Sequence, residues 1–421
     1  MNVRAAAAGD GTIHAGGDSA RTATATGVVV LRLREFDLLA ARIGEREARR
    51  LRDQAARRMR ATVGGRGTMR RTGEGEFAAL DLPPGTAATV AAEVSEAFSA
   101  PFSREGRNHY LRIAIGVAEG AAPVEHVLAD AVLAGRAARA GEIRSYEPGL
   151  RSAQEREMAL EMALRDAIVA RSADLDIAYQ PIFDVRARRL VGFEALARWT
   201  SPELGEVSPA CFIPIAENAG LAPVLGERIC ELAAATSGEV NRARRMAGEA
   251  PLFMSINLSA LQLAEPKLVA VMAAILDKTG GDPSHIRFEL TESVLLSGRD
   301  GAITIIEGLR ALGPAVTLDD FGTGYSSFSY LHELPVDGIK LGRSFIQQVP
   351  ESRRATEVVG ALIRLAHDLR LSVVAEGVET ESTWRALQEF DCDYVQGLLF
   401  GAPLTKARIL HPSGIAFPDI G

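Results

Sequence analysis

Cysteine is scarce in this chain, which contains only three in 421 residues. Cys211, Cys230 and Cys392 lie far apart and fit no paired spacing. A framework of disulfides is therefore not indicated, and reduced thiols in a cytoplasmic protein are the simplest interpretation.

Long hydrophobic runs and a surplus of positive charge are missing too. No apolar run approaches the roughly 20 residues that span a membrane. The first 26 residues, rich in Ala, Gly and Thr, lack the apolar segment of a secretory signal, and we expect 1–26 to be a disordered tail. A net charge of −7 argues against binding to nucleic-acid polymers.

What remains is the composition of a soluble globular protein, 47% hydrophobic and 24% charged, with enough length for more than one domain. Residues 27–147 mix strand and helix patterns, which predicts one small α/β domain. The predicted strands are Val28–Leu33, Phe77–Leu82 and His109–Val117, and the predicted helices are Glu45–Thr62, Ala87–Phe98 and Val124–Ala140.

A charged amphipathic stretch follows this domain. Ser152–Arg171 carries apolar residues at helical spacing, so residues 148–172 are predicted to form a helix that connects two domains. An independent coiled coil is the alternative interpretation.

From residue 173 to 410 a rhythm of strands and helices appears. Short apolar, β-branched runs each end in a polar residue and are followed by a helical stretch, which predicts a (β/α)8 barrel. The polar residues at the strand ends are Glu194, Asn257, Glu289, Asp319, Lys340, Glu376 and Gln396. In such a barrel the strand ends share one face, so these side chains are expected to converge. Residues 411–421 are expected to be a C-terminal tail.

Asp319 and Asp320 stand at the centre of this pattern, after the β-prone run Ala315–Leu318 and before a Gly/Thr/Ser loop. Two adjacent carboxylates repel each other, and a cation between them relieves that repulsion. The alternative is a helix N-cap next to a solvated acid.

The strand-end set offers oxygen ligands and no Cys or His, which favours Mg²⁺, Mn²⁺ or Ca²⁺ over zinc. Two such ions can clamp the attacking and leaving oxygens of a phosphoryl displacement. Lys340 could orient the attacking water, or it could form a salt bridge to one of the acids. Arg198 would hold a phosphate oxygen if the strand has ended before it; otherwise it is a surface arginine.

Ordered motifs run through residues from about 155 to 408. They are Tyr179–Ile182, Glu194–Trp199, Phe212–Pro214, Asn257–Ser259, Glu289–Glu292, Asp319–Ser327, Leu334–Asp337, Arg343–Phe345, Ala375–Glu379, Gln396–Gly397 and Pro403–Leu404. In this order they resemble the EAL domain family, the cyclic-di-GMP phosphodiesterases.

The resemblance implies a modified TIM barrel that hydrolyses cyclic di-GMP to linear pGpG with two Mg²⁺ or Mn²⁺ ions. It assigns metal binding to Glu194, Asn257, Glu289, Asp319, Asp320 and Glu376. It assigns catalytic roles to Lys340, Gln396, Glu376 and Glu292, and substrate contacts to Gln180, Leu196, Arg198 and Glu379. Glu292 would brace the loop after Asp320, and that loop would couple the site to the interface of a homodimer.

Two positions depart from the family pattern. Gly342 stands where the family has Asp in Lys-Ile-Asp, and Leu398 stands where it has Tyr in Gln-Gly-Tyr. The six ligand positions are intact, so activity is expected. A silent cyclic-di-GMP receptor and a protein-interaction module are the alternatives.

The N-terminal domain resembles the GGDEF family of cyclic-di-GMP synthases in degenerate form. Arg71–Phe77 stands where the family has Arg-x-Gly-Gly-Asp-Glu-Phe, and Arg32 and Arg34 stand where a metal-binding carboxylate is needed. Ala40 and Arg49 replace nucleotide-side residues. We expect no cyclase activity and a regulatory or dimerising role, with GTP as a possible ligand.

Overall fold

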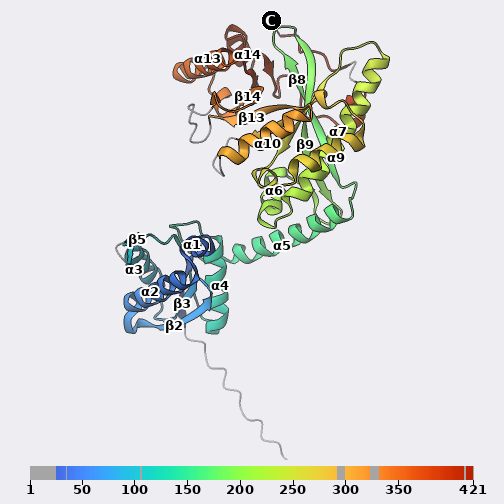
Figure 1. Cartoon of the computed structure of the whole chain (residues 1–421). Coiled ribbons are helices and arrows are strands. Elements are labelled where there is room, and N and C mark those ends of the chain that lie inside the picture. The colour runs from blue at the N-terminus through green and yellow to red at the C-terminus, as the bar shows by residue number, and fades with distance from the viewer. Residues whose placement is uncertain are drawn as a thin grey trace, which may run out of the picture. The chain divides into compact units, whose positions relative to one another are not determined.

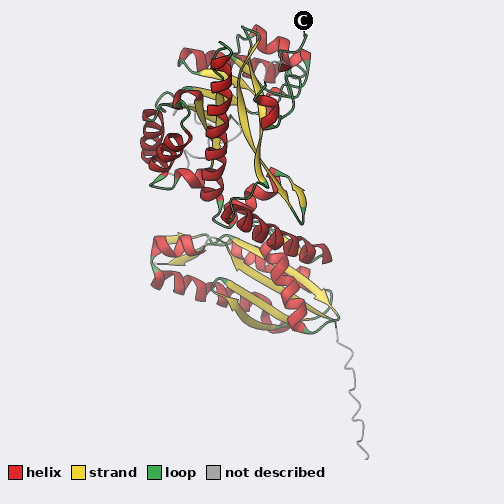
Figure 2. Ribbon diagram, turned by 90° about the vertical axis from the view of Figure 1, so that its right-hand side faces the viewer, coloured by secondary structure: helices red, strands yellow, loops and turns green. Residues whose placement is uncertain are grey.

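The computed structural model describes residues 25–34, 36–104, 107–291, 299–322, 331–411 and 414–420. The chain divides into two compact units, Met1–Arg156 and Glu157–Gly421, and each is described by itself (Figures 1 and 2). The predicted disordered tail falls almost wholly outside the described residues. Among the helices of those residues, none is both long enough and apolar enough to cross a bilayer.

The N-terminal unit is built on a five-stranded sheet with the order β2-β3-β1-β6-β7. Its strands are β1 (Thr26–Leu33), β2 (Thr68–Gly73), β3 (Glu76–Leu82), β6 (Ile113–Gly120) and β7 (Ile143–Ser145). A separate hairpin pairs β4 (Phe102–Arg104) with β5 (Arg107–His109). Outside the sheet, the unit also contains the helix α1 (Phe36–Ile43) and the 3-10 turn η1 (Gly64–Arg66), together with the longer helices that cover the sheet.

The side chains of β1 point alternately to the two faces of the sheet, and this explains why helices cover both faces. Val29 and Leu31 point into the core beneath α2 (Glu45–Val63) and α3 (Ala87–Ser99). Val28 and Val30 point the other way, into a second cluster with α4 (Val124–Ala137). Successive strand side chains face opposite sides, so one apolar run serves both layers.

The predicted elements of this unit are present, with corrections at their ends and with additions. The helix predicted over Val124–Ala140 ends at Ala137, and α1, β7 and the β4–β5 hairpin were not predicted. The predicted strand His109–Val117 is wrong at its start, since β6 begins at Ile113 and His109 ends β5. The strand β2 was not predicted, because Thr68–Gly73 is polar and mostly exposed and so lacks an apolar alternation.

The connector helix α5 spans Pro148–Val169, so it begins where the predicted range 148–172 begins and ends three residues earlier. Leu160, Leu164 and Ile168 join the core of the C-terminal unit. Just beyond the helix, Arg171 has a left-handed backbone with φ 49°. The C-terminal half of α5 is therefore part of the barrel unit's packing.

The C-terminal unit is a closed barrel. Its sheet order is β10-β9-β11-β12-β13-β14-β15-β16-β8, and the pairing of β8 with β9 closes the ring. The strands are β8 (Leu175–Asp184), β9 (Arg189–Ser201), β10 (Gly205–Val207), β11 (Phe253–Leu258), β12 (Ile286–Thr291), β13 (Ala315–Phe321), β14 (Gly338–Leu341), β15 (Ser372–Ala375) and β16 (Tyr394–Val395).

This barrel departs from a regular (β/α)8 barrel at one strand. β9 and β11 to β16 run parallel, whereas β8 runs antiparallel to both of its neighbours. β8 and β9 form the long green pair of strands in Figure 1. The modified TIM barrel expected from the sequence is therefore present, with its modification at β8.

Helices follow the barrel strands, as the rhythm of the sequence predicted. They are α6 (Pro209–Asn218), α7 (Ala222–Met246), α8 (Ala260–Leu263), α9 (Leu268–Thr279), α10 (Arg299–Ala311), α12 (Arg343–Ile346), α13 (Arg353–Asp368), α14 (Glu381–Glu389) and α15 (Lys406–Ile409), with the 3-10 turn η2 (Pro283–His285). Hydrophobic residues of these helices and of the strands form one continuous core.

The barrel interior is closed at the N-terminal ends of the strands by an aromatic and cationic plug. The Arg287 guanidinium lies 3.6 Å from the ring centroid of Phe253 and 5.1 Å from that of Tyr394. Because β11 and β16 are not neighbours in the ring, these contacts cross the inside of the barrel. Gly192 makes room for this plug, since a Cβ there would lie 2.5 Å from the Phe253 ring. The opposite end is thereby left for the site.

The predicted C-terminal tail packs against the barrel where it is described. Phe417 contacts the rings of Phe183, Trp384 and Phe400, with centroid distances of 5.3–5.6 Å. Ile420 is buried. This aromatic cluster joins the last residues to β8 and α14.

The thiols offer a direct test of this packing. Cys230 and Cys392 are buried, and burial raises the pKa of each to about 12, whereas Cys211 is exposed. Because the thiolate is the reactive form, we expect Ellman's reagent at pH 8 to modify Cys211 alone in the folded protein. All three thiols should react in denaturant. Fast modification of a second thiol without denaturant would contradict the barrel packing, and Cys211→Ser should remove the fast phase.

Candidate active site

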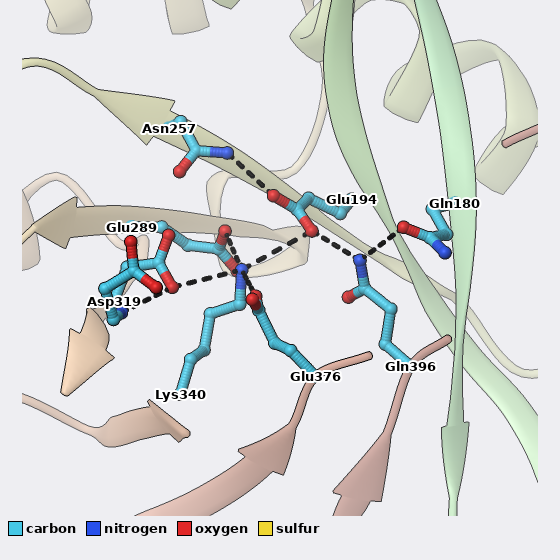
Figure 3. A network of polar contacts seen from close by, with 9 residues as sticks. Gln180, Glu194, Asn257, Glu289, Asp319, Lys340, Glu376 and Gln396 are labelled. Atoms are coloured by element: carbon cyan, nitrogen blue, oxygen red, sulfur yellow. Dashed lines mark hydrogen bonds and ion pairs between the residues drawn. The ribbon is translucent and has the colours of Figure 1, made fainter. Parts of the chain in front are cut away.

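The candidate site is organised around one buried lysine. Lys340 on β14 has no exposed surface, and its Nζ lies 2.7 Å from Glu289, 3.4 Å from Glu194 and 3.5 Å from Asp319. Glu376 is a fourth carboxylate in contact with the same ammonium. Figure 3 shows these side chains converging from β9, β12, β13 and the end of β15.

Amide side chains extend the network on one side. Asn257 Nδ2 donates a hydrogen bond of 2.8 Å to Glu194, and Gln396 Nε2 donates to Glu194 and, at 2.9 Å, to Gln180 Oε1 (Figure 3). All seven strand-end side chains therefore meet in one connected cluster, together with Gln180.

Strand register explains why the residues meet. In the parallel pairs, Asn257 lies opposite Glu289 and Asp319 lies opposite Thr291. In the antiparallel pair, Gln180 lies opposite Glu194. Inward-facing positions recur every second residue, so each strand delivers its polar group at a similar height in the barrel.

The lysine is held in its charged form. Burial acts to lower the pKa of Lys340, but the carboxylates of Glu194, Glu289, Glu376 and Asp319 together hold that pKa well above its usual value. Burial also acts to raise the pKa of Glu194, yet Lys340 and the two amides outweigh it and lower that pKa. Lys340 and Glu194 therefore form the ionised core of the cluster.

The other acids are not fully compensated by one lysine. Burial raises the pKa of Glu289 well above normal, raises that of Asp319, and raises that of Glu376 to about 7. Lys340 opposes each shift, while the neighbouring carboxylates add to it. An overcharged group of oxygen ligands is the donor set that hard divalent cations prefer, so the residues present fit such ions.

One part of the cluster has the geometry of an ion site. Carboxylate oxygens of Asp319, Asp320 and Glu376 lie within 4.8 Å of one another. Asp320 has a left-handed backbone with φ 52°, and its N–H donates a hydrogen bond of 2.8 Å to Asp319 Oδ1. Such a conformation in a non-glycine residue is strained and is concentrated at functional sites.

Gln396 also carries an orphan atom. Its Oε1 is buried and has no hydrogen-bond partner in the described part of the chain. The next residue, Gly397, has φ 158°, and a Cβ there would lie 2.2 Å from the carbonyl oxygen of Val378. Gly397 therefore lets its loop pack closely against the backbone of Val378. The Oε1 of Gln396 remains available as a hydrogen-bond acceptor.

One local prediction about β9 is wrong. The sequence placed the end of this strand at Glu194, but β9 continues to Ser201 because it pairs with β8 along its length. Arg198 therefore lies on a strand and not on a βα loop. Glu194, Leu196 and Arg198 are two residues apart in turn and share one face of β9. Arg198 Nη1 donates a hydrogen bond of 2.9 Å to the carbonyl oxygen of Ala197.

Some of the remaining predicted residues lie away from Lys340, and others fall outside the residues that the structure describes. Glu379 is exposed and forms an ion pair of 2.7 Å with Arg343. Glu292 and residues 323–330 of the predicted coupling loop fall outside the described residues. Gly342 begins α12 with an extended backbone, and Leu398 is exposed.

Two buried hydroxyl residues in the barrel were missed by sequence reasoning. Ser255 pairs in register with Glu194, and Thr317 pairs with Glu289. Each stands two residues before a candidate ligand on its own strand, Asn257 or Asp319, and so faces inward with it. The signal was a polar residue repeated with period two inside an apolar run.

A closed barrel with acids around one lysine at the strand ends defines a class of TIM-barrel-like proteins. Comparison with protein families gives a match to the EAL domain over residues 161–403, more than half of the chain. The chain belongs to the EAL domain family. Members of this family use divalent metal ions, and the acidic cluster described above is in keeping with that.

Individual relatives have names that are in keeping with this family. The bifunctional diguanylate cyclase/cyclic di-GMP phosphodiesterase MucR of Pseudomonas aeruginosa is 33% identical over 85% of this chain and 52% of its own length. The cyclic di-GMP phosphodiesterase NbdA of the same organism is 34% identical over 73% of this chain and 40% of its own length. The chain thus spans about half the length of the curated relatives it matches.

Solved structures show the same fold. The phosphodiesterase PaMucR in complex with c-di-GMP is 35% identical, with a TM-score of 0.55, and the match covers 60% of this chain and 99% of that one. The EAL enzyme Bd1971 bound to cAMP and cyclic-di-GMP is 27% identical, with a TM-score of 0.59, over 73% of this chain and 84% of the other.

Proposed function

We propose that this chain hydrolyses cyclic di-GMP to linear pGpG with two bound Mg²⁺ or Mn²⁺ ions. The observation that carries the proposal is that four carboxylates meet around Lys340. Two of them, Asp319 and Glu376, also belong to the oxygen cluster with Asp320. The names of NbdA and of the PaMucR complex support cyclic di-GMP as the substrate.

The ions would be held by the strand-end oxygens of Glu194, Asn257, Glu289, Asp319, Asp320 and Glu376. Asp319 would be the ligand that the two ions share; its Oδ1 lies 3.5 Å from Lys340 Nζ and accepts a hydrogen bond from the Asp320 N–H. When bound, such ions supply an activated water and stabilise charge on a phosphoryl oxygen. The raised pKa values of Glu289, Asp319 and Glu376 support this, because bound cations would stabilise the ionised carboxylates that burial and neighbouring acids disfavour.

Lys340 would act as a hydrogen-bond donor in this reaction. Its raised pKa keeps the ammonium protonated at neutral pH, so it donates to a water or phosphoryl oxygen and does not accept a proton. The free Oε1 of Gln396 would accept a hydrogen bond from the attacking water. Burial raises the pKa of Glu376 to about 7 before an ion is bound, so ion binding near neutral pH would release its proton and leave it ionised beside the attacking water. Glu292 remains a proposed brace of the loop after Asp320.

Substrate would lie along the inward face of β8 and β9. Gln180 is part of the network, while Leu196 and Arg198 extend from Glu194 on the same face. Arg198 would hold a phosphate oxygen and Leu196 would contact a base. Glu379, exposed beside Arg343, would contact substrate at the rim.

We propose that the N-terminal unit is a degenerate GGDEF-like domain without cyclase activity. Arg32 forms an ion pair of 3.0 Å with Glu76, the glutamate of the altered motif, and the two residues face each other in the β1–β3 register. A guanidinium here would displace a metal ion from that carboxylate. The MucR match supports the resemblance, since 85% of this chain is more than the barrel unit can supply.

This unit would regulate the barrel or hold two chains together, with GTP as a candidate ligand. We also propose a homodimer through the barrel and a cytoplasmic location. Sedimentation of the full chain with and without GTP tests the dimer.

The decisive experiment is a turnover assay on the full chain. We expect pGpG to accumulate from cyclic di-GMP with Mg²⁺ or Mn²⁺, to stop on addition of EDTA, and to resume when metal is restored. GTP as the only nucleotide should give neither cyclic di-GMP nor pGpG. Metal-saturated protein that binds cyclic di-GMP without hydrolysing it would overturn the proposal and indicate a receptor.

A further inference from the structure

A second charged site lies away from the strand ends, where α5 meets the outer helices of the barrel. A cavity of about 250 Å³ is lined by residues from the end of α5, from α7 and from α9. Every lining residue belongs to the unit Glu157–Gly421. Ile168, Val224, Val271 and Ile275 form its apolar lining.

Three cations of this cavity converge on one carboxylate. Glu231 accepts hydrogen bonds from Arg171, just beyond α5, and from Lys278 on α9. Arg228, one helical turn before Glu231 on α7, lies 3.5 Å from the oxygen that Arg171 already occupies. Glu231 therefore pairs with all three cations, and Arg228 shares one of its oxygens with Arg171.

Arg228 is left without sufficient partners. Its Nε is buried and has no hydrogen-bond partner within the described residues. Burial lowers the pKa of Arg228, and the nearby Arg171 lowers it further. A buried guanidinium donor without an acceptor is unfavourable, and such a donor is normally satisfied by a protein group, a water or an ion.

Charge counting gives the sign of the missing partner. The lining holds three cations, Arg171, Arg228 and Lys278, against two carboxylates, Glu227 and Glu231. The cavity therefore carries a net positive charge, and its unsatisfied group is a donor.

We propose that this cavity binds a small anion, a phosphate or carboxylate group on a short apolar body, and that the anion fixes the end of α5 to α7 and α9. The head group would accept hydrogen bonds from Arg228, Arg171 and Lys278. The apolar body would lie against Val224 and Ile275.

The cavity size limits the ligand. Sites for drug-sized ligands usually measure about 300–1,000 Å³, so 250 Å³ suits a smaller molecule than a dinucleotide. A compact anion therefore suits this volume better than cyclic di-GMP. Because Arg171 follows the connector helix directly, occupancy would order the junction through which α5 enters the barrel unit.

Calorimetry on the full chain, stripped of metal with EDTA and then desalted, tests this site, because the metal-free acidic cluster repels anions whether or not the protein is an active hydrolase. The probes are butyl phosphate, inorganic phosphate and butyrate, with chloride at matched ionic strength. We expect saturable binding of butyl phosphate, about tenfold tighter than inorganic phosphate because methylene groups are buried. Butyrate binding more tightly than inorganic phosphate would identify a carboxylate head group.

Variants give effects of opposite sign. Arg228→Gln should weaken binding at least tenfold and Lys278→Gln, at an exposed side chain, about threefold. Glu231→Gln should tighten binding, because it removes the carboxylate that competes for the cations. Arg242→Gln, at an exposed position on the same helix, is the matched control and should change nothing.

Amide exchange provides an independent readout of the junction. Butyl phosphate should slow exchange of residues 166–171, and Arg228→Gln should abolish that protection. Non-saturable heat, or binding that is unaltered in both Lys278→Gln and Glu231→Gln, would overturn the proposal and leave an ordinary ion-pair network.

Discussion

Replacing Lys340 with methionine is expected to lower turnover by about 10²–10³-fold, the usual loss when one buried donor to a reacting oxygen is removed. The same change should destabilise the metal-free protein by about 3–5 kcal/mol, because it leaves buried carboxylates without their cation. Lys340 has no exposed surface and contacts four acids, so water cannot compensate for its loss.

Arginine should not substitute for this lysine. The chain contains only four lysines and uses arginine for most of its cations, yet the buried centre carries an ammonium. A compact ammonium can be surrounded by oxygens on several sides, whereas a planar guanidinium directs its donors in a fork. We expect Lys340→Arg to lose turnover nearly as much as Lys340→Met.

Denaturant unfolding and initial rates, each with EDTA and with saturating Mn²⁺, would measure both effects. Mn²⁺ should recover part of the lost stability of Lys340→Met, because the cations and the ammonium neutralise the same carboxylates. Lys267→Met, at an exposed lysine, is the control. Turnover within threefold of the parent, with unaltered unfolding in EDTA, would refute the role given to Lys340.

The sequence allowed the strand-end residues to be predicted because each strand is a short local signal. Glu289, Asp319 and Gln396 follow apolar runs, and a parallel barrel brings such ends together irrespective of side-chain detail. The central place of Lys340 was not predictable in the same way. A salt bridge to one acid was an open alternative, and its contact with four depends on inter-strand register, which no local pattern contains.

Features that depend on packing between distant segments could not be predicted from the sequence. β9 runs past Glu194 because β8 pairs with it, and Arg198 is thereby on a strand. The Arg287 plug and the Arg228 cavity likewise join residues from elements far apart in the chain. Period and spacing report which way a side chain faces along one element, and they do not report which element lies opposite.

Asp319→Asn is expected to separate activity from stability. Asparagine keeps the size of aspartate but removes the charge that would bridge two cations, which we expect to raise the barrier by several kcal/mol. At about 1.4 kcal/mol for each factor of ten, turnover should fall by about 10³-fold or more. Half-saturation with Mn²⁺ should move to higher concentration at the same time.

The stability of the metal-free Asp319→Asn variant should not fall with its turnover. Burial raises the pKa of Asp319, and the neighbouring Glu194 and Asp320 add to that shift while Lys340 opposes it. Because the folded-state pKa lies above the unfolded one, the stability that the protonated group contributes at low pH is lost as pH rises through the folded-state pKa. A neutral asparagine side chain at this position removes that penalty, so metal-free Asp319→Asn should unfold at equal or higher denaturant concentration than the parent.

The measurements are pGpG formation, Mn²⁺ titration by calorimetry, and urea unfolding in EDTA at pH 7.5. Asp368→Asn, at an exposed position on α13, is the matched control and should leave all three unchanged. A stable variant that has lost turnover and Mn²⁺ affinity would place Asp319 among the metal ligands. Undiminished turnover in Asp319→Asn would require another set of ligands, because no other carboxylate of the described cluster lies between Lys340 and the Asp320 backbone.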